Sequence, residues 1–336
     1  MNDETKLKHG AIKRNPIHRW IRKLFRKKLH KLAGAPVPFD WTKGFDVETA
    51  TGTIERRNQG NSESCGGQAG AYFLTIQRAL QGIKEEISAK SIYAPIAYPT
   101  GGTTVTDLQK QICNAGANRE IDVPSMQNGN APTEQFMTDK SWMTSAWIKD
   151  ALTRSGYTPV SINHDLDSIA CAIRDYGGVF IELAAKNNGT WFSAYPKKPD
   201  VSVQDPSVWF HFMCGKAGIL NGQKVIGAFQ SWGASVGDNG VQYFTDDYIT
   251  SQYFLDVFTF VKTPKYLFTR NLTWYSFGKD VWELQKRLIQ EGVATFTYPT
   301  GLFFTNTFLS VKRYQAKYGI EQTGFCGELT RAQLNK

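Results

Sequence analysis

Apolar residues follow two different patterns along this chain, and the helical pattern comes before the strand-like one. Three early segments repeat apolar residues at the spacing of an α-helix, and three later segments are short apolar runs typical of strands. Because the helices precede the strands instead of alternating with them, the body is predicted to be α+β and not a βαβ array. The predicted helices cover 69–80, 141–153 and 165–174, and the predicted strands cover 178–184, 224–232 and 240–244.

The net charge of +9 lies entirely in an N-terminal basic arm, residues 1–34. The arm holds seven Lys and four Arg against Asp3 and Glu4, whereas the remainder balances its basic and acidic side chains. A neutral body disfavours a nucleic-acid-binding core. Apolar residues at helical spacing over 17–32 predict an amphipathic helix within the arm. Such a helix could lie on an anionic surface, dock into a partner's groove, or cover the body of its own chain.

A second change of pattern, near 262–272, precedes a helical C-terminal segment with an internal repeat. The turns Thr300-Gly301-Leu302 and Thr323-Gly324-Phe325 are followed by Thr307 and Thr330, which we expect to cap short helices. Each preceding amphipathic segment closes with a glycine suited to a helix C-terminus. The predicted domains are therefore the arm 1–34, a body over 35–265 and a helical domain over 266–336.

The cysteines and the beginning of the chain bear on the compartment. No apolar stretch reaches the roughly 18 residues of a membrane span, and the first residues lack the apolar stretch of a secretory signal. Five scattered cysteines predict neither a disulfide framework nor a zinc site. We therefore expect synthesis in a reducing cytoplasm. No cofactor or metal is expected, because Asp165 and Asp167 beside His164 have no supporting cluster. The cysteines are Cys65, Cys113, Cys171, Cys214 and Cys326.

Cys65 is the strongest candidate for chemistry. It lies directly before a predicted helix, where the positive end of the helix dipole favours a thiolate, the reactive form of the side chain. An imidazole nearby would favour the thiolate further, and only His164 and His211 lie outside the arm. The alternative is a buried, inert cysteine. Polar residues and glycines around Cys65 favour the reactive interpretation.

Four segments in order resemble the papain-like cysteine peptidases over about 38–250. The first runs from Pro38-Phe39-Asp40-Trp41 through Asn58-Gln59-Gly60 to Ser64-Cys65, and the second is Cys171 to Val179. His211 follows Cys65 by 146 residues, within the roughly 130–150 typical of this family. The last segment is Gln230-Ser231-Trp232-Gly233 with the glycine turn at 237–240. The resemblance implies a two-lobed fold, with a helical lobe and a β lobe.

The resemblance also implies a role for each matching residue. Cys65 would be the nucleophile and His211 the general base. Gln59 would donate its amide to the oxyanion hole together with the Cys65 backbone N–H. Gln230, standing where the family has Asn, would orient the imidazole, and Trp232 would shield the His–Gln pair from water.

This sequence departs from the family in three respects. Gln230 is one methylene longer than Asn. Gly66 replaces a Trp, and Glu63, two residues before Cys65, would raise the thiol pKa unless it pairs elsewhere. Ser62 replaces a cysteine that forms a disulfide in secreted members. The last departure agrees with a reducing compartment. The first two leave open a catalytically inactive copy of the fold that serves as a structural or attachment protein.

The C-terminal segment resembles the small three-helix peptidoglycan-binding domain of many cell-wall hydrolases. The similarity includes Gly278-x-x-Val281-x-x-Leu284-Gln285, then Val311-x-x-Tyr314-Gln315, with a Thr-Gly turn after each. The alternative is a helical module without affinity for the wall.

Together these resemblances imply a cysteine endopeptidase directed to the bacterial cell wall, acting on wall peptides or surface proteins. A wall enzyme without a recognisable export signal is expected of a phage, whose tail proteins assemble in the host cytoplasm and meet the wall from outside. We therefore predict a virion, tail-associated enzyme, with a phage structural protein or an anionic surface as partner of the arm. The alternative is a bacterial surface enzyme exported by another route.

Overall fold

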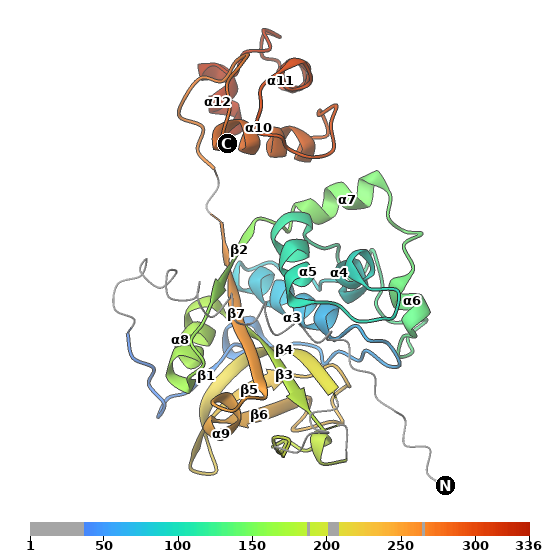
Figure 1. Cartoon of the computed structure of the whole chain (residues 1–336), viewed down its shortest axis with the longest axis vertical. Helices are drawn as coiled ribbons and strands as arrows, with labels where there is room; N and C mark the ends of the chain where they lie inside the picture. Colours follow the sequence, from blue (N-terminus) through green and yellow to red (C-terminus); the bar gives the residue numbers. More distant parts are fainter. Residues whose placement is uncertain (1–36, 187–188, 201–207, 264–265) are drawn as a thin grey trace. The chain divides into compact units, whose positions relative to one another are not determined.

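The computed structural model describes residues 37–186, 189–200, 208–263 and 266–336. The chain divides into two compact units, one ending at Lys262 and the other spanning Thr263–Lys336 (Figure 1). The sequence predicted this division between residues 265 and 266. The predicted helix of the basic arm lies outside the described residues.

A seven-stranded antiparallel sheet forms the β lobe of the first unit, in the order β2-β7-β3-β4-β5-β6, with β1 paired to β4 (Figure 1). The three predicted strands are present as β3, β5 and β6, and four further strands join them. The apolar pattern alone did not predict the long β4, because its apolar and small residues follow no clear period. The bounds are β1 Phe45–Asp46, β2 Tyr157–Ser161, β3 Val179–Ala185, β4 Val208–Leu220, β5 Gln223–Phe229, β6 Val241–Thr245 and β7 Phe254–Lys262.

Helix α3 is the centre of the helical lobe. Its first twelve residues are all buried, and α4 packs along it because Gly67 brings the two backbones close together. A Cβ at Gly67 would lie 2.7 Å from the Cβ of Tyr93. The predicted helices are present as parts of α3, α7 and α8. The bounds are α2 Glu48–Thr51, α3 Cys65–Leu80, α4 Ala89–Ile96, α5 Val105–Lys110, the π-helical η2 Gln111–Ala115, α6 Glu134–Thr138, α7 Ser145–Leu152, α8 Leu166–Tyr176, the 3-10 helix η3 Gly189–Phe192 and α9 Asp246–Ile249.

The sheet separates two hydrophobic clusters. Side chains alternate between the faces of a strand, so neighbours in β3 belong to different clusters. Phe180 packs with Phe73 of α3, whereas Ile181 packs in the cluster that holds Ile169 of α8. One face of the sheet therefore supports the helical lobe, and this confirms the predicted α+β, two-lobed fold.

The second unit is the predicted three-helix module, with α10 Lys279–Gln290, α11 Thr305–Lys317 and α12 Glu328–Leu334 around one core. The segments that precede the two Thr-Gly turns end as predicted, with Gly292 and Gly319 in the left-handed region just beyond α10 and α11. Among the described helices, none is long and apolar enough to cross a membrane.

The predicted caps at Thr307 and Thr330 are wrong. Neither residue is an N-cap, because Phe304 and Gly327 occupy those positions without a side-chain cap. Instead each threonine hydroxyl accepts a hydrogen bond from a buried glutamine amide, Gln285 in the first repeat and Gln315 in the second. The repeat therefore encodes two equivalent glutamine clamps.

The first clamp illustrates their chemistry. The Gln285 amide also donates to Leu302 O and its oxygen accepts from Thr300 N and Gly301 N. One side chain thus satisfies the hydrogen-bonding groups of several backbone positions in a tight turn. Buried backbone groups need such partners.

Candidate active site

Cys65 is the first residue of α3, at the positive end of a 16-residue helix. Its side chain is 1% exposed, and it lies against the β lobe. The unpaired N–H groups of a first helical turn stabilise negative charge, so this position favours a thiolate. The helix therefore carries the sulfur to the boundary between the two lobes.

His211 comes to the same place from β4, 146 residues later. Its Nδ1 lies 3.8 Å from the Sγ of Cys65, and the imidazole is 2% exposed. This is the distance of a weak hydrogen bond to sulfur or of a thiolate–imidazolium pair. The structure thus brings together the two residues on which the predicted chemistry depends.

Gly66 explains how the imidazole fits against the helix. A Cβ at this position would lie 2.6 Å from Cγ2 of Thr103 and 3.3 Å from Nδ1 of His211. A larger residue at position 66 would displace one of these neighbours. The departure from the family at Gly66 is therefore accommodated by close packing of Thr103 and His211.

Gln59 and Ser231 connect the segment before Cys65 to the segment after β5. Gln59 N donates to Ser231 O at 2.7 Å, and the Ser231 hydroxyl donates to Gln59 Oε1 at 2.5 Å. The Gln59 amide nitrogen donates to Ser62 O at 2.8 Å. The Ser62 hydroxyl donates to Gln59 O at 2.6 Å, so this residue braces the same turn without a disulfide. The oxyanion role of Gln59 stays a prediction.

Gln230 does not hold the imidazole in the way that the sequence suggested. Its amide nitrogen donates to Gly233 O, and its oxygen accepts from Trp232 N. Both hydrogen bonds close the turn in which Gln230 itself lies. The extra methylene, compared with Asn, lets the side chain curl back onto this turn, which corrects the expected contact with His211.

Trp232 is 5% exposed and packs edge-on against Phe210, with ring centroids 5.1 Å apart. It makes a similar contact with Phe212. These two residues flank His211 in β4, and the side chains of strand neighbours point to opposite faces. The indole thus anchors the turn to the strand that carries the histidine, and its shielding role stays a prediction.

A carboxylate that the sequence analysis did not single out faces the other side of the imidazole. Glu182 Oε1 lies 4.0 Å from His211 Nε2, and both side chains are almost fully buried. Glu182 is paired with His211 in the register of β3 and β4. Its signal in the sequence is a single acidic residue inside the apolar run 178–184, which is costly to bury without a charged neighbour.

Tyr72 of α3 connects its own helix to two other segments of the site by hydrogen bonds. Its hydroxyl accepts from Arg57 N at 2.7 Å and donates to Gln230 O at 3.0 Å. Burial raises the pKa of Tyr72 to about 12, so the ring stays neutral. The helix that carries Cys65 is therefore tied to the two segments that carry Gln59 and Gln230.

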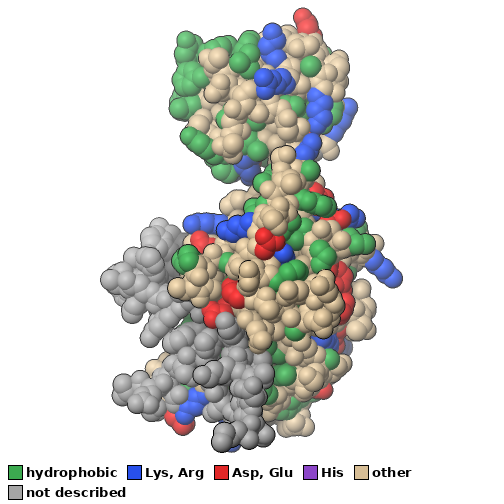
Figure 2. Space-filling view, turned by 90° about the vertical axis from the view of Figure 1, so that its right-hand side faces the viewer, with side chains coloured by type: hydrophobic (Ala, Val, Ile, Leu, Met, Phe, Trp, Pro, Cys, Tyr) green, Lys and Arg blue, Asp and Glu red, His purple; other side chains and the backbone are tan. Residues whose placement is uncertain are grey.

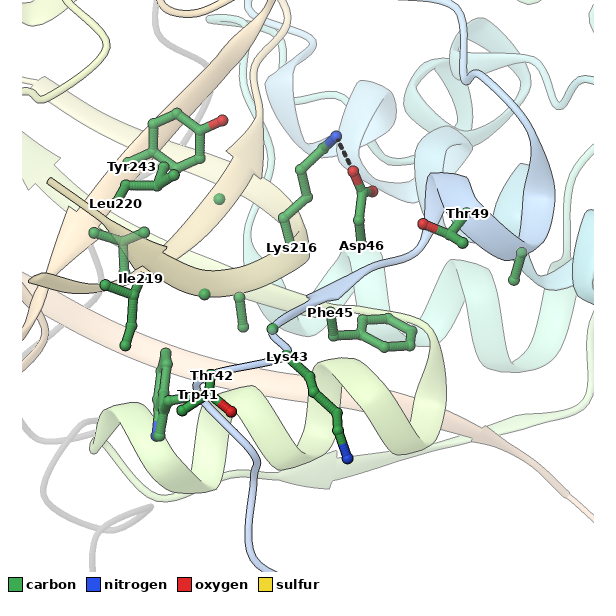
Figure 3. A pocket seen from close by; sticks show the side chains of 16 residues that line it. Trp41, Thr42, Lys43, Phe45, Asp46, Thr49, Lys216, Ile219, Leu220 and Tyr243 are labelled. Atoms are coloured by element: carbon green, nitrogen blue, oxygen red, sulfur yellow. Dashed lines mark hydrogen bonds and ion pairs between the residues drawn. The ribbon is translucent and has the colours of Figure 1, made fainter. Parts of the chain in front are cut away.

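A surface pocket of the described residues lies elsewhere. It has a volume of about 800 Å³ and is lined by β1, β4, β5 and the loop before β1, around the ion pair of Lys216 with Asp46 (Figure 3). None of the predicted site residues lines it. No group of three or more His, Cys, Asp or Glu among the described residues could hold a metal ion.

The first unit has two lobes, with a thiol at the start of a helix and an imidazole on a strand. This arrangement defines the papain-like cysteine protease fold, and solved structures with that fold match this chain. Xylellain, a cysteine protease from Xylella fastidiosa, matches with a TM-score of 0.57 at 16% identity, covering 78% of this chain and 98% of that one. Procathepsin B S9 from Trypanosoma congolense matches at 0.53 and 14%, covering 78% and 88%. Digestive procathepsin L 3 of Tenebrio molitor larval midgut matches at 0.52 and 18%, covering 72% and 77%. These matches show that the first unit has the fold of these proteases.

The second unit matches a family model in its own right. Residues 277–334 match the model described as "Putative peptidoglycan binding domain". A comparison with curated proteins found no match. The chain thus combines a unit of papain-like fold with a C-terminal unit similar to the putative peptidoglycan-binding domains.

Proposed function

We propose that this protein is a cysteine endopeptidase directed to the bacterial cell wall, with Cys65 and His211 as its catalytic pair. The observation that carries the proposal is the 3.8 Å distance between Cys65 Sγ and His211 Nδ1 at the start of a buried helix. Two residues so far apart in sequence meet here with the atoms that a thiol peptidase uses.

The reaction follows from this geometry. The Cys65 thiolate attacks the carbonyl carbon of a peptide bond, and the imidazolium of His211 gives its proton to the leaving amine. Water then attacks the thioester while His211 takes a proton from it, and the acid product leaves as the thiolate re-forms. The Cys65 N–H and the Gln59 amide would stabilise the oxyanion in both halves.

The second unit would supply attachment to peptidoglycan. It exposes several large apolar side chains, and hydrophobic atoms gather on one of its sides (Figure 2). Phe277, Trp282 and Leu302 line a pocket of about 590 Å³ together with Lys279 and Glu283. Aromatic faces beside one positive and one negative group suit a ligand with sugar rings and charged peptide ends.

A phage tail remains our proposal for the location, with the particle assembled in the host cytoplasm. The basic arm 1–34 would bind a structural protein of the particle or an anionic surface, since it carries the whole net charge. Purified particles from a source that encodes this chain should contain it, as judged by mass spectrometry. Its absence from particles would favour the bacterial surface instead.

The test of the enzyme uses the full chain with a peptide library and purified peptidoglycan. We expect new peptide ends with the wild type and none with Cys65→Ser, because oxygen does not replace the thiolate. Cys171→Ser is the matched control, since it removes a half-buried thiol from α8 without touching the site. Equal cleavage by wild type and Cys65→Ser would refute the peptidase.

Wall attachment is tested by sedimentation with peptidoglycan. We expect Phe277→Ala to release the protein into the supernatant, because this 72%-exposed ring lines the pocket. Leu329→Ala is the control, since its side chain is 71% exposed but does not line the pocket. Failure of the wild type to sediment would refute attachment.

The inactive structural alternative makes an opposite prediction for the same samples. The departures at Gly66 and Gln230 favour it. It predicts sedimentation with peptidoglycan but no cleavage of wall or library by the wild type. Cleavage that depends on Cys65 would exclude this alternative.

A further inference from the structure

Three neighbouring strands place three titratable side chains side by side. Glu182 of β3 is the register partner of His211 in β4 and of Asp256 in β7. Residues directly opposite each other in antiparallel strands point to the same face and have adjacent Cβ atoms. The imidazole and the two carboxyl groups therefore form a row on the face of the sheet that supports α3.

This row is buried from end to end. Glu182 and Asp256 are each 3% exposed, and His211 is 2% exposed. A carboxylate is expensive to remove from water unless a positive charge or hydrogen bonds compensate it. The imidazolium ring, with Nε2 4.0 Å from Glu182 Oε1, supplies such a charge.

We propose that Glu182, and not Gln230, is the residue that positions the imidazole of His211 and stabilises its protonated form. This inference rests on the proposed peptidase function for its biological meaning, but its test does not require activity. Nε2 lies on the side of the ring toward Glu182 and Nδ1 on the side toward Cys65 Sγ, so a proton on Nε2 would interact with the carboxylate. A 4.0 Å separation is an ion-pair distance, and a small movement would shorten it to a hydrogen bond.

The sequence difference at Gln230 fits this assignment. Its side chain is committed to Gly233 O and Trp232 N. A neutral amide oxygen stabilises a protonated imidazole less than a carboxylate does, because the carboxylate carries a full negative charge. In this protein the residue that orients the imidazole would thus lie in β3, beside the strand β4 that carries His211, and not in the turn after β5.

Other titratable groups around the imidazole define the electrostatic setting. Cys65 faces it from α3, and Asp256 lies beyond Glu182 on β7. On the helical side, Tyr93 interacts with Cys65 and donates its hydroxyl to Glu134. Asp256 is the carboxyl group next to Glu182 on the side away from His211.

The experiment is an NMR titration of His211 in the full chain carrying Cys65→Ala, which prevents autolysis and removes the thiol from the titration. An opposite charge within 4–6 Å raises an imidazole pKa by roughly one to three pH units. We expect Glu182→Gln to lower the pKa of His211 by at least about one unit. Glu182→Asp should keep most of the raised value, because it retains the charge.

Two further variants make the assignment specific. Glu55→Gln removes the same charge from the surface and should leave the titration within about 0.3 units, a long-range effect screened by solvent. Asp256→Asn should also leave it within about 0.5 units. An unchanged pKa in Glu182→Gln, or an equal fall in Asp256→Asn, would overturn the assignment to Glu182.

Failure of this proposal is distinguishable from failure of the peptidase. Cleavage is measured with chains that keep Cys65. If His211 titrates as expected while the Cys65-containing chain leaves peptides intact, the acid row stands and the enzyme proposal falls. If peptides are cut but Glu182→Gln leaves both the titration and the upper pH limit of kcat/KM unchanged, the reverse holds. Folding of each variant is checked by protection of the Cys214 thiol, which is fully buried in the wild type.

Discussion

Removal of the Tyr72 hydroxyl should loosen the candidate active site. It accepts from Arg57 N at 2.7 Å and donates to Gln230 O at 3.0 Å, and the ring is fully buried. Tyr72→Phe keeps the ring and leaves both backbone groups without this partner. Each unsatisfied buried group costs about 1–3 kcal/mol, so we expect a loss of about 2–4 kcal/mol in the free energy of unfolding.

The assay uses two buried thiols as reporters, one in each unit. Cys214 lies in β4, Cys326 lies in the core of the second unit, and both are 0% exposed. Burial raises the pKa of both thiols, so each reacts quickly only after its unit unfolds. Alkylation at increasing urea concentrations, resolved by peptide mapping, therefore gives a separate unfolding curve for each unit.

We expect Tyr72→Phe to lower the urea midpoint of Cys214 by about 1–1.5 M and to leave that of Cys326 unchanged. Tyr248→Phe is the graded control, because its buried hydroxyl donates only to Ala184 O, at 2.6 Å, and should cost about half as much. A loss below about 0.5 kcal/mol for Tyr72→Phe would refute the argument. So would an equal shift of the Cys326 curve.

Two further predictions concern acid stability and the second unit. Burial raises the pKa of Glu48, but hydrogen bonds from Arg56 and Lys216 outweigh it and hold the pKa at about 2. The resulting stability, up to roughly 3 kcal/mol, is complete above about pH 4.5 and is lost as pH falls toward 2. Glu48→Gln should therefore reduce the slope of the first unit's free energy of unfolding against pH in this range. An unchanged slope would contradict this. Gln285→Ala leaves Gly301 N and its neighbours without this hydrogen-bond partner. It should lower the urea midpoint of Cys326 alkylation by the equivalent of about 2 kcal/mol and leave that of Cys214 unchanged. Equal shifts of both midpoints would contradict the prediction.

The candidates Cys65 and His211 could be selected because each stands out in the sequence. Cys65 directly precedes a helical run, and His211 is one of two histidines outside the arm. The α+β class followed from the order of periodicities, and the C-terminal helices followed from their glycine ends. These features depend on residues close to one another in sequence.

The remaining features depend on distant residues. Glu182 reaches His211 only through the pairing of β3 with β4, and neither strand register can be derived from periodicity. Gln230 was misassigned because its own turn satisfies its amide more easily than a histidine on another strand does. Thr307 was misassigned because a buried glutamine from the preceding helix competes with the helix N-terminus for its hydroxyl.

The most direct test of the account is the rate at which Cys65 is alkylated by iodoacetamide between pH 5 and 6. A thiolate stabilised by His211 and the start of α3 should react at least about tenfold faster in the wild type than in His211→Ala. Cys171 provides the internal reference, since burial raises its pKa and it lies outside the site. Equal rates for Cys65 in the two proteins, with Cys171 unchanged, would contradict the thiolate–imidazolium pair.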